Sequence, residues 1–422
     1  MKRWLGWITA FLITLISITQ FKIFALNHQP VGINILMPAP FAKSTAELVN
    51  QFNQENRGSI KLKVTTGPME TEAVSDLAIS SLLLGKSPFD VLLIDVTWLP
   101  KYAAADWLQP MDEWIDQQDI QSLAPGARLG NTYNEHLYRW PLVADMGLLY
   151  WRTDLMNQPP KTPEELIKIS KKLQREGRVK HGYLWQGRQY EGLSCVFLEV
   201  LDGFGGNWLT QGTNIVGLNQ PSSIKAASWL RELISTGVSP EAVIDYAENE
   251  VLQAFKSGDS ALMRNWPYAW AELQKSDSNV KDKVAVTTMV ASPGHDATAT
   301  LGSWGFSILK DSPNPKAAAK VIEFLTSTSA QKQLFLDSGY TPTKTEVFND
   351  PDVLQESKII PELAKALNIA EPRPETPLYA QISDVLQRQL SEVLTGQQDV
   401  KSSMDRAQTD TQQILLATGV GQ

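Results

Sequence analysis

Short apolar segments that alternate with longer amphipathic stretches constrain the fold of this chain more than any other feature. The apolar segments are about four to six residues long and the amphipathic stretches about ten to fifteen, an alternation typical of βα units. Strands are predicted over 33–37, 60–65 and 91–94, and the last is a near-continuous apolar run of the kind found in buried parallel sheets. The sequence therefore predicts an α/β fold.

Helix-start and helix-stop signals place the remaining elements. Ser44 and Glu47 predict a capping box that opens a helix over 44–56, and Thr162 followed by Pro163 predicts a helix over 162–175. Further along the chain we expect helices over 221–236, 250–256 and 313–327, and strands over 260–263 and 304–309. The tail over 352–416 is predicted to be almost all helical, without further strands and with a proline-rich interruption over 371–377.

The length and charge of the chain limit the kinds of protein it can be. With 422 residues, 43% hydrophobic and 20% charged, it has the composition of a soluble globular protein and enough residues for two domains. The formal net charge is -8, and residues 1–25 contain three cations and no acid, so the remainder carries -11. Such an acidic body is a poor partner for nucleic acid or anionic lipid, and we expect neither.

The first 25 residues have the pattern of a secretory signal peptide. Lys2 and Arg3 precede an apolar run over 4–21, and Ala25 follows as a small residue suited to cleavage. We expect cleavage near Ala25 and a periplasmic location. The alternative is an uncleaved membrane anchor, because the run approaches spanning length.

Cysteine and histidine usage argues against disulfides, lipid attachment and metals. Cys195 is the only cysteine, so no intramolecular disulfide can form, and it lies too far from the N-terminus to accept a lipid. His28, His136, His181 and His295 are scattered without ligand spacing, whereas zinc needs clustered donors. We therefore predict neither a metal site nor a cofactor.

Seven motifs, spread in order along the chain, together carry a resemblance to a known family. They are 95–99 (DVTWL), 147–155 (GLLYWRTDL), 185–193 (WQGRQYEGL), 264–270 (RNWPYAW), 293–295 (PGH), 300–304 (TLGSW) and 372–374 (PRP). Through them the chain resembles the trehalose/maltose-binding members of the family 1 extracellular solute-binding proteins of carbohydrate ABC importers. Each motif alone is weak, and their combination is specific.

The resemblance implies a two-lobed periplasmic binding protein of the maltose-binding-protein type. It places 30–140 and 303–345 in one lobe, and 146–300 with 346–422 in the other, joined by a hinge that the chain crosses three times. It also implies a non-catalytic monomer that closes on a small glucoside in the interlobe cleft and delivers it to the permease subunits in the membrane.

A sugar presents apolar C–H faces and a ring of hydroxyls, so its site needs aromatic platforms together with carboxylate, guanidinium or amide partners. The resemblance assigns such roles to residues from distant parts of the chain. The candidate ligand-binding residues are Asp95, Asp145, Tyr190, Glu191, Trp266, Tyr268, Gly302, Ser303, Trp304 and Arg373.

Structural alternatives remain open for the polar candidates. Asp95 follows a predicted strand, where ligands of open α/β sheets bind, but it equally suits the N-cap of a helix starting near Thr97. Asp145 is alternatively a hinge residue that satisfies backbone donors. Arg373 stands between two prolines, which hold it extended, and its alternative is a surface ion pair with Glu371 or Glu375.

The aromatic candidates have alternatives as well. Pro267 makes the segment around Trp266 and Tyr268 a turn or a helix start, which argues against a regular core stripe, and the resemblance implies ligand stacking there, whereas Trp270 suits core packing. The segment 302–304 is alternatively a plain turn into a strand, and the segment around Tyr190 and Glu191 is alternatively structural.

Three departures from the family pattern bear on the ligand. The loop over 38–42 lacks an acid, the segment 73–76 lacks a base, and Val143 replaces an aromatic before Asp145. Fewer polar side chains from the first lobe suggest a smaller or less hydroxylated glucoside, such as glucosylglycerol or sucrose, in place of trehalose or maltose. Two other functions stay open: a secreted glycoside hydrolase that uses Asp95 and Asp145, and a surface carbohydrate adhesin.

Overall fold

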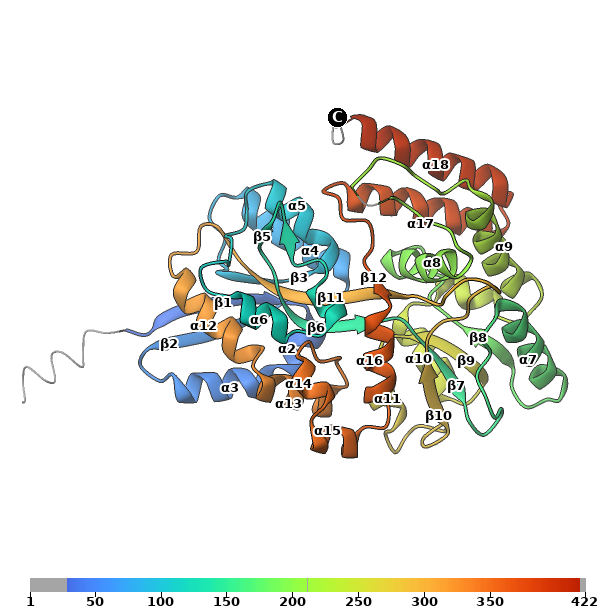
Figure 1. Cartoon of the computed structure of the whole chain (residues 1–422), viewed down its shortest axis with the longest axis horizontal. Coiled ribbons are helices and arrows are strands. Elements are labelled where there is room, and N and C mark those ends of the chain that lie inside the picture. The colour runs from blue at the N-terminus through green and yellow to red at the C-terminus, as the bar shows by residue number, and fades with distance from the viewer. Residues whose placement is uncertain (1–28, 211, 418–422) are drawn as a thin grey trace, which may run out of the picture. The chain divides into compact units, whose positions relative to one another are not determined.

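The computed structural model describes residues 29–210 and 212–417 of the chain (Figure 1). These residues divide into two compact units. The first contains the described residues up to Leu92 together with Asp311–Leu325, and the second contains Leu93–Lys310 and the described residues from Thr326 onward. The predicted signal peptide lies outside the described residues. Among the described residues, no helix combines the length and the apolarity that a membrane crossing requires.

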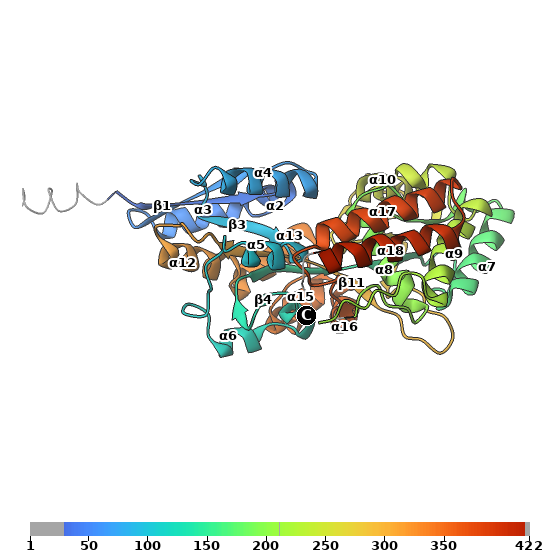
Figure 2. The ribbon, with the colours of Figure 1, turned by 90° about the horizontal axis from the view of Figure 1, so that it is seen from above.

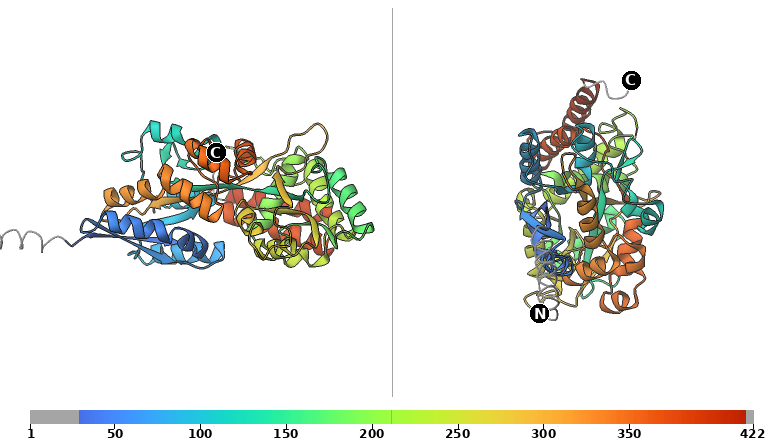
Figure 3. Two further views of the ribbon diagram at one scale, coloured as in Figure 1. Left: turned by 90° about the horizontal axis from the view of Figure 1, so that it is seen from below. Right: turned by 90° about the vertical axis from the view of Figure 1, so that its left-hand side faces the viewer.

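The first unit is built on parallel strands, as predicted. β1 (Val31–Met37) pairs with β2 (Ile60–Thr66) along its whole length and with the first two residues of β3 (Val91–Asp95). Its helices are α2 (Ala39–Ser44), α3 (Ala46–Glu55), α4 (Thr71–Leu83) and α12 (Pro315–Leu325). Although α3 and α12 are far apart in the sequence, they lie side by side (Figure 3), with the rings of Phe52 and Phe324 edge to face at 5.3 Å.

The predicted capping box at Ser44 is wrong. A helix begins earlier instead, with Pro38 as its N-cap and Pro40 at its second position, where a proline is tolerated, and Ser44 becomes the last residue of α2. Thr45 keeps a helical conformation and leads directly into α3 without a side-chain cap. The hydroxyl of Thr45 donates instead to the carbonyl of Phe41, at 2.8 Å.

Two larger sheets and one small hairpin form the strands of the second unit. In the first sheet, β11 (Ala299–Ile308) pairs antiparallel with β6 (Trp140–Met146) and parallel with β12 (Ala370–Glu371). The second sheet runs in the order β10 (Val284–Thr287), β7 (Leu148–Arg152), β9 (Ser260–Asn265) and β8 (His181–Leu184). The hairpin joins β4 (Thr132–Tyr133) to β5 (His136–Leu137).

Two strand predictions for this unit need correction. β11 begins at Ala299, five residues before the predicted start, because Gly302 and its neighbours pair with β6 instead of forming a turn. The tail contains the short strand β12, which the helical pattern around it hides, since two residues are too few to show a period of two.

Helices pack around these sheets and enclose a large apolar core. The predicted N-cap at Thr162 is confirmed, because its hydroxyl accepts from the backbone N–H of Glu165 at 3.2 Å.

The helices of this unit are α5 (Leu99–Ala104), α6 (Gln117–Ser122), α7 (Pro163–Arg175), α8 (Glu191–Gly203), α9 (Pro221–Ser235), α10 (Glu248–Lys256), α11 (Ala269–Leu273), α13 (Thr328–Ser338), α14 (Thr345–Phe348), α15 (Pro351–Glu356), α16 (Ile360–Asn368), α17 (Tyr379–Thr395) and α18 (Val400–Ala417). Figure 2 shows α17 and α18 side by side. Helix α8 is buried along nearly its whole length and carries Glu191 at its first position.

Candidate functional site

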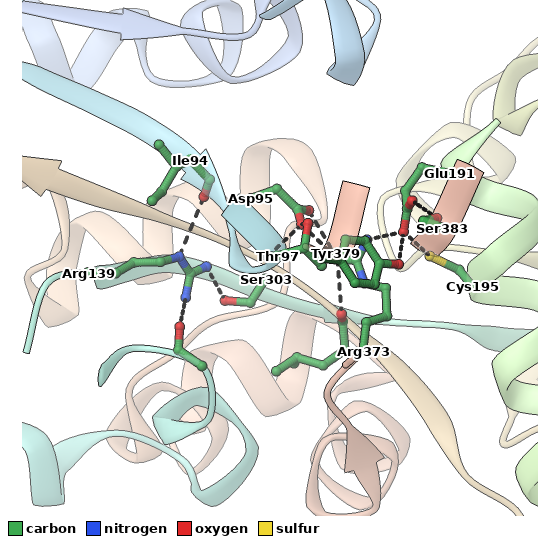
Figure 4. Close-up of polar contacts among 12 residues, drawn as sticks. Ile94, Asp95, Thr97, Arg139, Glu191, Cys195, Ser303, Arg373, Tyr379 and Ser383 are labelled. Carbon is green, nitrogen blue, oxygen red and sulfur yellow. Dashed lines mark hydrogen bonds and ion pairs between the residues drawn. The ribbon is translucent and has the colours of Figure 1, made fainter. Parts of the chain in front are cut away.

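A buried guanidinium gathers two carboxylates from distant parts of the second unit. Arg373 is only 3% exposed. Its Nη2 donates to both carboxylate oxygens of Asp95, at 2.9 and 3.1 Å, and its Nη1 donates to Oε1 of Glu191 at 2.7 Å (Figure 4). We call these three residues the carboxylate–arginine cluster. The alternative of a surface ion pair with Glu371 or Glu375 is wrong, because the buried guanidinium pairs with other acids.

Asp95 combines two of the roles that the sequence left open. It ends β3, and its Oδ1 accepts from the backbone N–H of Thr97 at 2.9 Å and from the Thr97 hydroxyl at 2.7 Å, which caps the short 3-10 helix Val96–Trp98. Its Oδ2 accepts only from Arg373 within the described residues. Capping thus uses one oxygen, and the other keeps acceptor capacity for a further donor.

Glu191 is occupied by donors of its own protein. Besides Arg373, its carboxylate accepts from the hydroxyls of Tyr379 at 2.5 Å and Ser383 at 2.7 Å, both on α17. Burial raises the pKa of Glu191, and the charge of Arg373 opposes that rise. The pKa of Arg373 is itself raised, because attraction to Asp95 and Glu191 outweighs the effect of burial. Glu191 therefore fixes one side of the guanidinium, while Nε of Arg373 has no hydrogen-bond partner within the described residues.

Two indoles form an aromatic corner beside Asp95. Trp98, three residues after Asp95, and Trp304 on β11 are both half-buried. Their rings meet edge to face, with centroids 5.3 Å apart and planes at 77°. The carbonyl of Leu301 on the same strand accepts a hydrogen bond from Arg373 at 3.5 Å, which links β11 to the cluster. Trp304 was predicted from the resemblance, whereas Trp98 was not chosen although it stands in the same motif as Asp95.

A second aromatic group surrounds Glu248, which the sequence did not single out. Nε1 of Trp266 donates to Glu248 at 3.1 Å. The pKa values of Tyr190 and Tyr268 are raised, mainly because both side chains are buried and also because the negative charge of Glu248 is close. Gly302 leaves room for Trp266, since a Cβ at that position would lie 2.6 Å from Cζ3 of the indole. Three of the predicted residues, Tyr190, Trp266 and Tyr268, thus interact with one unpredicted carboxylate, and Gly302 packs against one of them.

The segment 302–304 is a strand, so the alternative of a plain turn is wrong. Gly302 lies opposite Asp145 and Trp304 opposite Val143 in the pairing of β11 with β6. Ser303 is fully buried between them. Its hydroxyl donates to the carbonyl of Val143 at 2.8 Å and accepts from Nη2 of Arg139 at 2.7 Å, so both of its main bonding positions are filled internally.

Arg139 is a second fully buried guanidinium, and the sequence analysis missed it. It donates to Oδ1 of Asn131 at 2.6 Å, to Ser303, and over longer distances to the carbonyls of Gly130 and Ile94. Burial lowers the pKa of Arg139 to about 9, although the nearby charge of Asp95 partly opposes this. Its contacts hold together the segment before Asp95 and the strand that carries Ser303.

Asp145 is a buried carboxylate without an ion pair in the described chain. Its Oδ1 accepts from the backbone N–H of Thr341 at 2.9 Å. Burial raises the pKa of Asp145 to about 7, and the hydrogen bond from Thr341 limits the rise. The alternative role of satisfying a backbone donor is therefore present, and one carboxylate oxygen remains for a ligand.

A cavity of about 940 Å³ lies elsewhere in the second unit and contains none of the predicted ligand residues. Its lining residues are mostly polar and include four acids: Asp116, Gln118, Asp119, Ser122, Thr328, Lys344, Thr345, Glu346, Asn349, Asp350 and Pro351. Within the described residues, no three potential metal-ligating side chains converge. The groups around Arg373, in contrast, combine aromatic rings with charged side chains.

The chain as a whole is similar to known proteins. The family model for bacterial extracellular solute-binding proteins matches residues 38–332. The chain is 34% identical over 346 residues to a probable ABC transporter-binding protein of Deinococcus radiodurans, covering 79% of this chain and 82% of the relative. It is 27% identical to a maltotriose-binding protein of Pyrococcus abyssi, covering 74% of this chain and 66% of the relative.

A solved structure shows the same fold. The maltose-bound MalE3 protein of T. maritima superimposes with a TM-score of 0.84 and 31% sequence identity, covering 90% of this chain and 99% of that chain. The expected fold class, the α/β fold of two-lobed periplasmic binding proteins, is thereby confirmed. Arg373 and α17 lie beyond the segment that the family model matches.

Proposed function

Because the chain belongs to the family of bacterial extracellular solute-binding proteins, we propose that it captures a small glucoside for an ABC importer and delivers it to the membrane permease. The similarity to an ABC transporter-binding protein, a maltotriose-binding protein and a maltose-bound structure supports sugar transport. Export to the periplasm is part of the proposal and rests on the N-terminal pattern of residues 1–25.

The carboxylate–arginine cluster beside the Trp98–Trp304 corner is the observation that carries this proposal. Sugar hydroxyls bind strongly to charged acceptors and donors, and Oδ2 of Asp95 and Nε of Arg373 both retain capacity for such bonds. The indoles supply rigid apolar surface for the C–H face of a pyranose ring. Because Glu191 is filled by internal donors, we assign it the role of holding Arg373 and leave ligand contact to Asp95.

The arrangement suits binding better than hydrolysis. A glycoside hydrolase needs one carboxyl group as acid and a second as nucleophile or base. Arg373 neutralises the charge of Asp95 through two hydrogen bonds, which weakens it as a nucleophile. The family and the fold are those of binding proteins. We therefore propose a non-catalytic protein, and release of glucose from sucrose or a nitrophenyl glucoside at enzyme-like rates would refute this.

The ligand we propose is a small glucoside: trehalose, sucrose, maltose or glucosylglycerol. The departures over 38–42 and 73–76 and at Val143 favour the smaller members of this group. The relatives above are named for maltose and maltotriose, so a strict preference for maltose over glucosylglycerol and sucrose would contradict the size argument without affecting the transport role.

Calorimetric titration of the chain lacking residues 1–25 with these four sugars tests the function. At least one sugar is expected to bind with a stoichiometry of one, and Trp304→Ala is expected to weaken its binding by about 2 to 4 kcal/mol, the loss typical of a buried hot spot. Trp114→Ala is the matched control, because Trp114 is also half-buried in the second unit but is not among the candidate ligand residues. The proposal fails if none of the four sugars binds, and equal losses in both variants would remove Trp304 from the site.

A further inference from the structure

Trp266 is held by several neighbours although it lies in the turn between β9 and α11. Its indole Nε1 donates to Glu248, and its backbone carbonyl accepts from the hydroxyl of Tyr150 at 2.8 Å. The ring also rests against Gly302. A half-buried tryptophan in a turn ordinarily has alternative side-chain rotamers, so these contacts restrict an otherwise adaptable side chain.

A fully buried ion pair lies against the indole. The guanidinium carbon of Arg264, two residues before Trp266, stands 4.0 Å from the centroid of its ring. Arg264 donates to both oxygens of Glu199, with Nε to Oε2 at 3.0 Å and Nη2 to Oε1 at 2.5 Å. Gln186 accepts from Nη1 at 3.4 Å and donates to the Arg264 carbonyl at 3.1 Å. The plane of the guanidinium is thus fixed by acceptors, and one of its faces is offered to the indole.

Burying this ion pair costs desolvation free energy and restricts the residue that can stand next to it. Arg264 and Glu199 are both 0% exposed. Any side chain at Gly147 would overlap the carboxylate of Glu199, so the chain between β6 and β7 must be glycine there. A buried ion pair seldom stabilises a fold more than apolar residues of similar volume do, because desolvation offsets the attraction. Stability alone therefore does not explain the pair, whereas its contact with Trp266 gives it a role.

We propose that the Arg264–Glu199 pair is a positioning device that sets the ring of Trp266 as a sugar-stacking platform. The proposal rests on the proposed function, because the platform has a purpose only if a sugar binds. Glu199 orients the guanidinium, the guanidinium supports one face of the indole through a cation–π contact, and Glu248 fixes its rotation through Nε1. Neither Arg264 nor Glu199 needs to touch the ligand, and each acts through the indole.

A double-mutant cycle between the pair and the indole tests this role. The variant Arg264→Met/Glu199→Gln removes both charges and keeps an acceptor for the backbone N–H of Thr300, which Glu199 accepts at 3.3 Å. We expect affinity for the best-binding sugar to fall about tenfold in the wild-type background and to be unchanged when Trp266→Ala is already present. An equal loss in both backgrounds would show that the pair acts independently of Trp266 and would overturn the proposal.

Two further variants separate positioning from general support of the fold. Arg264→Lys retains a cation for Glu199 but loses the planar stack, so its affinity is expected to fall while its melting temperature stays closer to that of the wild type. Arg152→Met/Asp154→Asn removes another Arg–carboxylate pair of the second unit, with two contacts of 2.7 Å, and is expected to leave affinity unchanged. Wild-type affinity in Arg264→Lys, or an equal loss in the control, would contradict a positioning role.

A measurement without ligand keeps this inference separate from the transport proposal. In protein labelled with 5-fluorotryptophan, the ¹⁹F resonance of Trp266 is assigned by its loss in Trp266→Phe. One sharp line is expected in the wild type, and a broadened or doubled line is expected in Arg264→Met/Glu199→Gln. A sharp line in both proteins overturns the positioning role, whereas failure of all four sugars to bind the wild type overturns the transport role.

Discussion

Two regions of the second unit bury charged side chains, and the neighbours of these side chains differ: carboxylates pair with a guanidinium in one region, and only neutral groups bond to the charges in the other. In the carboxylate–arginine cluster, Arg373 meets Asp95 and Glu191 directly. Along β6, Arg139 and Asp145 stand just before the strand and near its end, and each is bonded only to neutral groups within the described residues. We call Arg139 and Asp145 the lone charges of β6.

This difference shows that a nearby opposite charge, more than the depth of burial, determines the direction in which the pKa of a buried side chain shifts. Burial is the largest cause that lowers the pKa of Arg139 to about 9 and raises the pKa of Asp145 to about 7. The pKa of the equally buried Arg373 is raised instead, because two carboxylates outweigh desolvation. Arg373 thus stays a cation, whereas Asp145 can change its charge near neutral pH.

Replacing Arg373 is expected to produce the largest effect. Arg373→Met leaves Asp95 and Glu191 buried without their cation, which typically costs about 3 to 5 kcal/mol of unfolding free energy. Urea unfolding measures this loss. Arg388→Met is the control, because Arg388 forms an exposed i,i+4 pair with Asp384 of the kind that contributes about 0.3 to 0.5 kcal/mol. If both variants lose equally little, the distinction drawn for the cluster fails.

A smaller loss is expected when the cation of β6 is removed. Arg139→Met gives up hydrogen bonds to Asn131 and Ser303 but also removes a charge that forms no ion pair within the described residues, so we expect the unfolding free energy to fall by about 1 to 3 kcal/mol. The same urea titration ranks it against Arg373→Met. A larger loss for Arg139→Met would reverse the comparison and show that neutral acceptors support a buried guanidinium as well as carboxylates do.

The smallest expected effect is a pH dependence that belongs to Asp145. Its pKa is about 7 in the folded chain and 3.8 as an ordinary carboxyl, so the folded state binds the extra proton between these values. The unfolding free energy of the wild type is therefore expected to fall as the pH rises from 6 to 8, relative to Asp145→Asn, by about 1 to 2 kcal/mol. Parallel stability curves for the two proteins would mean that burial does not raise the pKa of Asp145 in the folded chain.

Local rules predicted the parts of the molecule that depend on neighbouring residues. The apolar run 91–94 placed Asp95 at a strand end, Pro267 placed Trp266 and Tyr268 in a turn, and Thr162 marked the start of a helix. The false capping box at Ser44 shows the limit of such rules, since Pro38 offers a competing start that the motif alone does not weigh.

Local rules could not predict the buried charged residues that support the candidate site. Arg139, Arg264 and Glu199 each stand in segments where a single charge would ordinarily be assigned to a solvated face, and only the packing of separate strands and α8 removes them from water. Trp98 was within reach, because it shares a motif with Asp95. Glu248 was not, because its role depends on an indole 18 residues away.

The contribution of α17 has a consequence for how the protein comes into being. Carboxylates at positions 95 and 191 are synthesised early, but the guanidinium and the two hydroxyls that complete their surroundings arrive only with residues 373, 379 and 383. A nascent chain, which folds from its N-terminus as it emerges, must keep this region open and hydrated until almost nine-tenths of its length exists. Ribosome-stalled fragments that end before Arg373 should therefore hold water where the finished protein holds an ion pair.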